Sequence, residues 1–428
     1  MSAEKQSLRP FFIMWVGQAV SLLGSRLVQF ALIWWLTQET GSGTVLALAT
    51  LVGLLPQVLI GPLAGTLVDR WDRRRTMMAA DSLVAGATVL LGLLFWSGHI
   101  AIWHIYALLF VRAVGGSFHY PAMNASISLM VPKIHLSRVQ GMNQMLQGSL
   151  SIVAAPLGAL LLAFLPMQSI LAIDVVTALL AIGALLVIHV PRPMPLSLGE
   201  GLAGPSFWVE LRQGFHYVRN WGGLFFLLIL AMGLNLVLTP TFSLMPLLVI
   251  DHFQGGALEL GWMEAAWGVG IVAGGLLLGV WGGFQRRILT SLIGIVGLGI
   301  GVLTLGMTPA HWLPLAIAAA LFTGLTSPII NGPIAAVVQA AVSLDMQGRV
   351  FSLMGSAAAA MTPLGLLIAG PLSDATDVRY WFVFAGAVVL VLAIVGFLSP
   401  ALLNIEEDGQ RMVPATKAAT PASAATGA

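Results

Sequence analysis

The amino-acid sequence predicts an all-α integral membrane protein with twelve transmembrane helices, arranged as two pseudo-symmetric halves of six helices each. The chain has 428 residues, of which 58% are hydrophobic and only 8% are charged, whereas soluble domains carry roughly 25% charged residues. Its apolar runs are about 20 residues long, which is the length of a membrane-spanning helix and twice that of a strand in a membrane barrel. Short motifs also recur between the two halves of the chain at one fixed spacing.

Hydropathy predicts the twelve spans in chain order. They cover residues 11–37, 44–69, 76–97, 101–130, 139–164, 168–190, 221–250, 258–283, 288–308, 311–341, 348–371 and 378–400. The first apolar run follows "MSAEKQSLRPFF" and continues for a full span. We therefore expect a first transmembrane helix there and not a cleaved signal peptide.

The distribution of basic residues predicts the orientation. If the N-terminus is cytoplasmic, 16 of the 19 lysine and arginine residues fall in cytoplasmic segments. Only Arg379 falls in an outer loop, and Arg26 and Arg112 fall within spans. Because cytoplasmic loops of membrane proteins are enriched in basic residues, we expect both termini in the cytoplasm.

The longest internal loop divides the chain into six spans and six. Its first part, residues 191–206, is rich in proline and glycine, which is typical of a linker. The next stretch, "FWVELRQGFHYVRN", has apolar residues at helical spacing and predicts a short interfacial helix. We therefore expect four regions: a half at 1–190, a cytoplasmic loop at 191–220, a half at 221–403 and a disordered cytoplasmic tail at 404–428.

Two motif pairs predict an internal duplication. "PAMN" at 121–124 corresponds to "PIIN" at 328–331, and "PLG" at 156–158 corresponds to "PLG" at 363–365. Both pairs are separated by 207 positions, which follows from the residue numbers. Parallel six-helix repeats are an arrangement of secondary transporters, in which the substrate site lies between the halves.

Several classes of function are excluded by what the sequence lacks. There is no cysteine, so disulfides, thiol catalysis and thiolate metal sites are absent. The eight histidines show no HExxH spacing, and no GxxxxGK[ST] phosphate loop is present. We expect no metal, no cofactor and no nucleic-acid partner, and a chain that is not an enzyme.

The segment "GTLVDRWDRRR" at 65–75 resembles the loop between spans two and three of the major facilitator superfamily. The family pattern is roughly G-x-x-x-D-R-x-G-R-[RK]. Its matches here are Gly65, Asp69, Arg70, Arg73 and Arg74. Asp72 stands where the pattern has glycine and is a departure from it.

Other segments narrow the resemblance. "RAVGGSF" matches the family motif R-x-x-x-G through Arg112 and Gly116, and "GSLSIVAAPLGA" partly matches the antiporter motif of span five. "WVGQAVSLLGS", "LAIDVVTALL", "AGGLLLGVWGGF" and "GRVFSLMGS" resemble the bacterial macrolide-efflux branch of drug:proton antiporters. The similarity covers nearly the whole chain except the tail.

The resemblance implies that the loop between spans two and three is a gate. In that reading Asp69 contacts the start of span eleven, near Gly348 and Arg349, and latches the two halves when the cytoplasmic side is closed. We place Asp81, close to the same loop, in the charge network around it.

Charged residues within spans are costly in a bilayer and are functional candidates. A carboxylate that loses and regains water as a cavity opens to each side can carry a coupled proton. The candidates for proton coupling are Glu264, Asp174, Arg112 and Arg26.

The fold implied by the resemblance lines its cavity with spans one, four, seven and ten. A large apolar compound needs mainly apolar wall and a few hydrogen bonds there. The polar candidates on these spans are Gln18, Gln29, His119, Asn124, Asn235 and Asn331, together with Phe118 and Thr239.

The function expected from these observations is proton-coupled export of amphipathic drugs by a monomer in the cell (inner) membrane. Its partners are the small-molecule substrate, protons and the lipid bilayer. Three alternatives stay open: the same fold acting on a dedicated siderophore or lysophospholipid, a multispan membrane enzyme, and a chain that works beside a separate ATP-binding protein.

Overall fold

The computed structural model describes residues 8–68, 71–190 and 207–407, and every regular element in these ranges is a helix. The first half of the chain forms α1 (Arg9–Thr40), α2 (Gly43–Val68), α3 (Arg73–Ser97), α4 (Ile102–Met130), η1 (Lys133–His135), α5 (Leu136–Phe164) and α6 (Met167–Val187). Helix α7 (Phe207–Arg219) follows, and then α8 (Gly222–Ser243), α9 (Met245–Leu247), η2 (Leu248–His252), α10 (Ala257–Trp281), α11 (Arg287–Met307), α12 (Leu313–Ala341), α13 (Leu344–Ala375), α14 (Arg379–Leu398) and α15 (Pro400–Leu403).

The long helices agree with the predicted spans. In the described part of the chain, eleven helices are long and apolar enough to cross a membrane. Helix α4 is the twelfth by position, and it is less apolar because Arg112, His119 and Asn124 interrupt it. The predicted fold of two six-helix halves is confirmed. The first half is α1–α6, and the second consists of the long helices α8, α10, α11, α12, α13 and α14.

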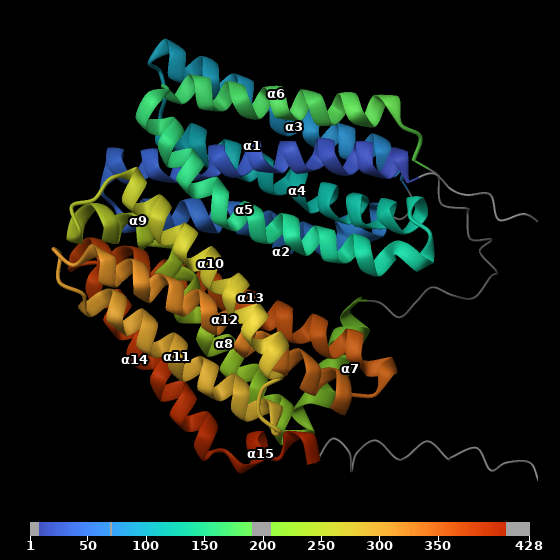
Figure 1. The fold of residues 1–428 in the computed structure, drawn as a ribbon, viewed down its shortest axis with the longest axis vertical. Helices are drawn as coiled ribbons and strands as arrows, with labels where there is room; N and C mark the ends of the chain where they lie inside the picture. Colours follow the sequence, from blue (N-terminus) through green and yellow to red (C-terminus); the bar gives the residue numbers. More distant parts are fainter. Residues whose placement is uncertain (1–7, 69–70, 191–206, 408–428) are drawn as a thin grey trace, which may run out of the picture.

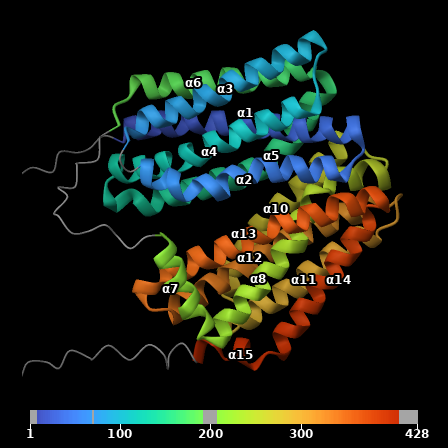
Figure 2. The same cartoon turned by 180° about the vertical axis from the view of Figure 1, so that it is seen from behind.

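The two halves form a wedge. In Figure 1 they meet at one end and separate toward the other, and Figure 2 shows the same arrangement from behind. The end where they meet, here called the closed end, contains the junction of α1 with α2 and the end of α13. The opposite end, here called the open end, contains the start of α1, the end of α6, α7 and α15.

Two helix pairs join the halves, α2 with α13 and α5 with α10. Both seams bring backbones close together through glycine. A Cβ atom on Gly268 of α10 would lie 2.9 Å from the carbonyl oxygen of Ser151, and one on Gly370 of α13 would lie 2.9 Å from the Cα of Thr44. Small residues allow such close packing in membranes, where helices associate by van der Waals contact.

An aspartate of α13 caps the start of α2 across the closed end. The Asp374 carboxylate accepts hydrogen bonds from the backbone N–H of Gly43 at 2.6 Å and of Thr44 at 3.2 Å. It also accepts one from the Ser42 hydroxyl at 2.9 Å. The first N–H groups of a helix have no partner within the helix, and a carboxylate favours this positive end of the helix dipole. Asp374 therefore holds the two halves together where they meet.

The predicted duplication agrees with the helix order. Pro121 and Pro328 lie in α4 and α12, the fourth long helices of their halves, and Pro156 and Pro363 lie in α5 and α13, the fifth. The seventh span is shorter than predicted. Helix α8 ends at Ser243, and the chain continues as the short elements α9 and η2. Pro246, within α9, has no N–H with which to continue α8.

The structure has helix α7 where an interfacial helix is predicted, and α7 packs on α13. The linker at 191–206 lies outside the described residues. The tail predicted to be disordered from residue 404 is packed as far as Glu407, and that part of the prediction is wrong. Ile405 is fully buried beside Gly223, and Glu407 lies 3.4 Å from Arg286. The side chain of Ile405 is apolar and lies close to the last helix, so it is buried in the apolar core of the second half. Residues 408–428 lie outside the described part.

Candidate functional site

Two arginines in the first turn of α3 bind carbonyl oxygens of neighbouring helices. Arg73 Nη1 donates to the carbonyl oxygen of Ala125 in α4 at 2.9 Å. Arg74 donates to the carbonyl oxygens of Leu185, at 2.5 Å, and Leu186, at 2.8 Å, at the end of α6. Leu185 and Leu186 are among the last carbonyls of α6, which have no partner within the helix, and cations favour this end. Both arginines thus tie α3 to other helices of its own half.

The remaining residues of the predicted gate are less defined. Asp69 and Arg70 lie outside the described residues, so the expected contact with the start of α13 stays a prediction. Gly65 lies in α2, and a Cβ atom there would meet no atom within 4 Å. The same holds for Gly348.

Asp72, the departure from the family pattern, begins α3. Its backbone is extended, with φ −67° and ψ 104°, and its Oδ1 accepts a hydrogen bond from the backbone N–H of Arg75 at 3.1 Å. This is the geometry of a helix N-cap, for which aspartate is among the preferred residues. The replacement of glycine therefore exchanges backbone freedom for a side chain that starts the next helix.

A cavity of about 390 Å³ lies within the first half and is lined by residues of α1 to α6. Most of the predicted polar candidates of this half line it, and we call it the polar cavity. These residues are Gln18, Arg26, Gln29, Asp81, Arg112, His119, Asn124 and Asp174.

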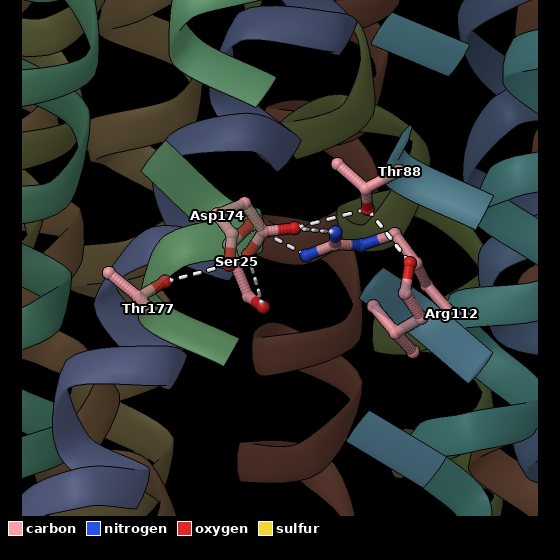
Figure 3. A network of polar contacts seen from close by, with 6 residues as sticks. Ser25, Thr88, Arg112, Asp174 and Thr177 are labelled. Carbon is pink, nitrogen blue, oxygen red and sulfur yellow. Dashed lines mark hydrogen bonds and ion pairs between the residues drawn. The ribbon is translucent and has the colours of Figure 1, made fainter. Parts of the chain in front are cut away.

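An ion pair joins α4 to α6 at the wall of this cavity (Figure 3). Arg112 Nη1 lies 2.7 Å from Asp174 Oδ2, with side chains that are 13% and 2% exposed. The carboxylate also accepts hydrogen bonds from Ser25 Oγ at 3.0 Å and Thr88 Oγ1 at 3.2 Å. Arg112 Nη2 donates to the carbonyl oxygen of Ser25 at 2.9 Å. Both charges are thus fully engaged, and the network connects α1, α3, α4 and α6.

A second polar cluster joins α1, α3 and α4. Asp81 Oδ2 accepts a hydrogen bond from Gln18 Nε2 at 3.1 Å, and Asp81 Oδ1 lies 3.4 Å from His119 Nε2. The same histidine nitrogen is 2.9 Å from Gln18 Oε1. The structure therefore pairs Asp81 with residues of the polar cavity. The sequence had suggested instead that Asp81 belongs to the charge network around the loop between α2 and α3.

Another cavity, of about 370 Å³, lies between the two halves, and we call it the interhalf cavity. Its walls come from α1, α5, α8, α9, α10 and α12, and they include Phe30, Ile33, Phe242 and Trp267. Glu264 is the acidic residue of its lining, and its side chain is exposed to the cavity. Within the described ranges no hydrogen bond or ion pair reaches this carboxylate, and the cation that acts on it electrostatically is Arg26. Arg26 lines both cavities, as Gln29 does.

Sequence reasoning missed a stripe of carboxamides on α5. Gln140, Asn143, Gln144 and Gln147 all line the polar cavity. Their spacing of i, i+3, i+4 and i+7 places them on one helix face. That spacing was visible in "QGMNQMLQ", but the expected cavity was confined to the first, fourth, seventh and tenth spans.

Some candidates of the second half do not reach either cavity. Asn235 and Asn331 donate to carbonyl oxygens one turn earlier in their own helices, Ala231 and Ser327, each at 3.0 Å.

In the first half, the candidate Phe118 lines neither cavity and stacks on Trp71, with 5.9 Å between the ring centres. In the described part of the chain, no cluster of His, Asp and Glu could hold a metal ion.

A family model described as "Transmembrane secretion effector" matches residues 6–424 of the chain. Macrolide efflux protein A of Streptococcus pyogenes is 35% identical over 387 residues, which cover 90% of this chain and 94% of the relative. The protein of the same name from Enterococcus faecalis is 34% identical over 76% of this chain and all of the relative. The multidrug efflux pump Tap of Mycobacterium tuberculosis is 27% identical over 93% of this chain and 95% of its own length.

Solved transporter structures share the fold. The inward-facing, unoccupied structure of a bacterial homologue of the human lysosomal transporter Spinster matches with a TM-score of 0.72 at 14% identity, over 95% of this chain and 99% of that one. The inward-open structure of the xylose transporter XylE of E. coli matches with a TM-score of 0.67 at 12% identity, over 92% and 99%. At these identities the likeness establishes the architecture alone.

Proposed function

The chain belongs to the transmembrane secretion effector family, in the macrolide-efflux branch of the major facilitator superfamily, and from this we propose that it exports amphipathic, macrolide-like drugs in exchange for protons. Membership of this family makes it a multi-span efflux transporter. The identity of the drug, the coupling to protons and transport by alternating access belong to the proposal. So do the cytoplasmic position of both termini and the cell (inner) membrane as its location.

The observation that carries the proposal is the position of Glu264. It is a carboxylate in the cavity between the two halves, surrounded by apolar wall and without a hydrogen-bond partner in the described residues. An ionisable group in such a place is costly unless it serves transport. Asp174, the other deep candidate, is held by Arg112, Ser25 and Thr88. Glu264 is therefore free to exchange a proton or bind a substrate, and Asp174 serves the integrity of its half.

The wedge shape supports alternating access. The halves are joined at the closed end by the two glycine seams and by Asp374, and they separate toward the open end (Figure 1). Rocking one half against the other about the cavity between them would expose that cavity to each side in turn, as in transporters built from two repeats. Glu264 and Arg26 lie on opposite halves, α10 and α1, so this motion changes the distance between their charges.

The test is Glu264→Gln in purified protein reconstituted into liposomes, with drug-stimulated proton movement as the measurement. Glutamine keeps the shape of the side chain and cannot carry the proton. We expect at least about a tenfold fall in drug-driven proton flux, since removing a positioned proton carrier typically costs 10²–10⁴-fold in catalysed proton transfer. Glu259→Gln is the matched control, because Glu259 lies on the same helix and its carboxylate bonds the backbone N–H of Gly256 outside the cavity.

The same liposomes separate the proposed coupling from an ATP-binding partner. Drug accumulation driven by an imposed pH gradient, without ATP, is the expected result. Transport that appears only with a second protein and ATP would contradict proton coupling, as would full proton-coupled export by the Glu264→Gln variant.

A further inference from the structure

We propose that the polar cavity is a hydrogen-bonding subsite for the uncharged, hydroxyl-rich part of the exported compound, such as a neutral sugar, and that the interhalf cavity takes its apolar part. This inference rests on the proposed export of amphipathic drugs. It assigns a role in substrate recognition to the uncharged carboxamides of α5.

The stripe on α5 carries the argument. Three of its members, Gln140, Gln144 and Gln147, are exposed to the polar cavity, and their side chains make no hydrogen bond within the described residues. Asn143 accepts one hydrogen bond from Trp15 Nε1, at 2.7 Å, and keeps its amide N–H groups. Polar side chains in a membrane helix normally bond to neighbouring helices or to their own backbone. A helix face on which three of four carboxamides lack such partners is suited to a ligand.

The opposite walls present the same chemistry. Gln29 of α1, Gln57 of α2 and Asn124 of α4 line the same cavity and are also exposed. No hydrogen bond involves their side chains in the described part of the structure. Each carboxamide offers two N–H donors and one carbonyl acceptor, which matches a hydroxyl group that both donates and accepts.

Two charged clusters of the cavity are matched within the protein and do not compete for this ligand. Arg112 is held by Asp174, and Asp81 is held by Gln18 and His119. Arg26 also lines this cavity, but it lines the interhalf cavity as well, where Glu264 supplies the opposite charge. Apart from Arg26, the free hydrogen-bonding capacity of the polar cavity is that of neutral amides. This arrangement favours a neutral polyhydroxyl group over an anion or a bare cation.

Two helices carry the wall from one cavity into the other and change polarity on the way. On α5 the carboxamide stripe is followed by Ser151, Ala154 and Ala155, which line the interhalf cavity. On α1, Gln29 lines both cavities, and Ile33, one turn further along, lines only the interhalf cavity. An amphipathic molecule placed along these helices finds hydrogen bonds at one end and apolar wall at the other. Each cavity is within the range of about 300–1,000 Å³ that is typical of small-molecule sites.

The experiment measures binding to the full-length protein in lipid nanodiscs. The two probes are erythromycin, which carries a neutral sugar, and the derivative from which that sugar has been hydrolysed. The variant is Gln144→Leu/Gln147→Leu, which keeps the side-chain volume and removes the hydrogen bonds. Gln38→Leu is the matched control, because Gln38 is an exposed glutamine of α1 outside both cavities. Size-exclusion profiles and thermal midpoints establish that each variant is folded.

We expect removal of the sugar to weaken binding to the wild type and to the Gln38→Leu protein by about tenfold. The double variant should bind erythromycin about tenfold less tightly than the wild type and should discriminate between the two probes by less than about threefold, since each lost hydrogen bond is worth a few-fold in affinity. Equal binding of both probes by the wild type, or an equal loss for both probes in the double variant, would overturn the inference and leave export intact. Failure of the folded wild type to bind either probe would overturn the proposed function and the inference together.

Discussion

The acidic side chains within the membrane differ in what surrounds them, and this difference decides what each can do. Asp174 is almost fully buried and has a cation and two hydroxyl donors. Burying such a pair gains little net stability, but breaking it leaves an uncompensated charge and is strongly destabilising. Glu264 lies in a largely apolar cavity, and the cation that acts on its carboxylate electrostatically is Arg26. We therefore propose different roles for two carboxylates that are both proton-coupling candidates in the sequence.

Replacement of Asp174 by alanine should therefore damage folding before it damages coupling. It leaves the largely buried Arg112 without its partner, at a cost of about 3–5 kcal/mol. Asp174→Asn keeps the side-chain shape and one acceptor oxygen for the hydroxyl donors, and it should cost less. The measurement is the apparent thermal midpoint of the purified protein. Asp377→Ala is the control, because that aspartate pairs with Arg379 in an exposed site worth under about 1 kcal/mol. Unchanged midpoints in both Asp174 variants, with loss of proton coupling, would argue for Asp174 as the proton carrier.

At the scale of helices, the ends of elements do much of the work. Arg74 binds two of the last carbonyls of α6, Arg73 binds the carbonyl of Ala125 in α4, and Asp72 starts α3. These contacts lie within one half. Asp374 makes the same kind of contact between halves, because it sits on α13 and binds the first N–H groups of α2. We call the contact of Asp374 with the start of α2 a latch, because it joins the two halves and would have to break if they separated at the closed end.

Asp374→Asn should weaken this latch and shift the protein toward a state in which the closed end opens. The loss of a carboxylate at a helix N-terminus is worth about 1–2 kcal/mol, or roughly a five- to thirtyfold change in the conformational equilibrium. The distance between spin labels on cysteines placed at Glu39 and Thr376 measures the shift. The absence of native cysteine makes such labelling specific.

Asp377→Asn provides the control for the latch, because Asp377 is near in sequence but bonds within its own segment. An identical label distance distribution in the wild type and in the Asp374→Asn protein would mean that the glycine seams alone hold the closed end together.

At the scale of the whole molecule, the two halves touch mainly through α2 with α13 and α5 with α10. The Arg112–Asp174 network belongs to the first half and one apolar cluster belongs to the second, whereas another apolar cluster, which includes Phe30 and Phe382, contains residues of both halves. The main cavities therefore differ in kind. The polar cavity is lined by one half and the interhalf cavity by both, so the rocking that we propose would change the shape of the interhalf cavity.

The orientation of the whole molecule is open to a direct test. The excess of arginine and lysine predicts that the open end faces the cytoplasm. Single cysteines at Arg219 and Arg286 should then react with a membrane-impermeant thiol reagent only after the cells are permeabilised. Cysteines at Ser42 and His311 should react in intact cells. The opposite pattern would invert the topology and the direction of transport that we propose.

The sequence by itself determined the helices, their number, their pairing into two repeats and the family. These properties follow from local hydropathy and from short motifs, which each segment carries irrespective of its neighbours. Only the tertiary structure decided which charges are matched, since the partners of Asp174 and Asp81 come from helices far apart in the chain. It also placed Glu264 opposite Arg26, removed Asn235 and Asn331 from the cavity, and brought the carboxamide face of α5 into it. Hydropathy predicts which segments lie in the membrane. The direction in which each side chain points depends on how the helices rotate and tilt against one another.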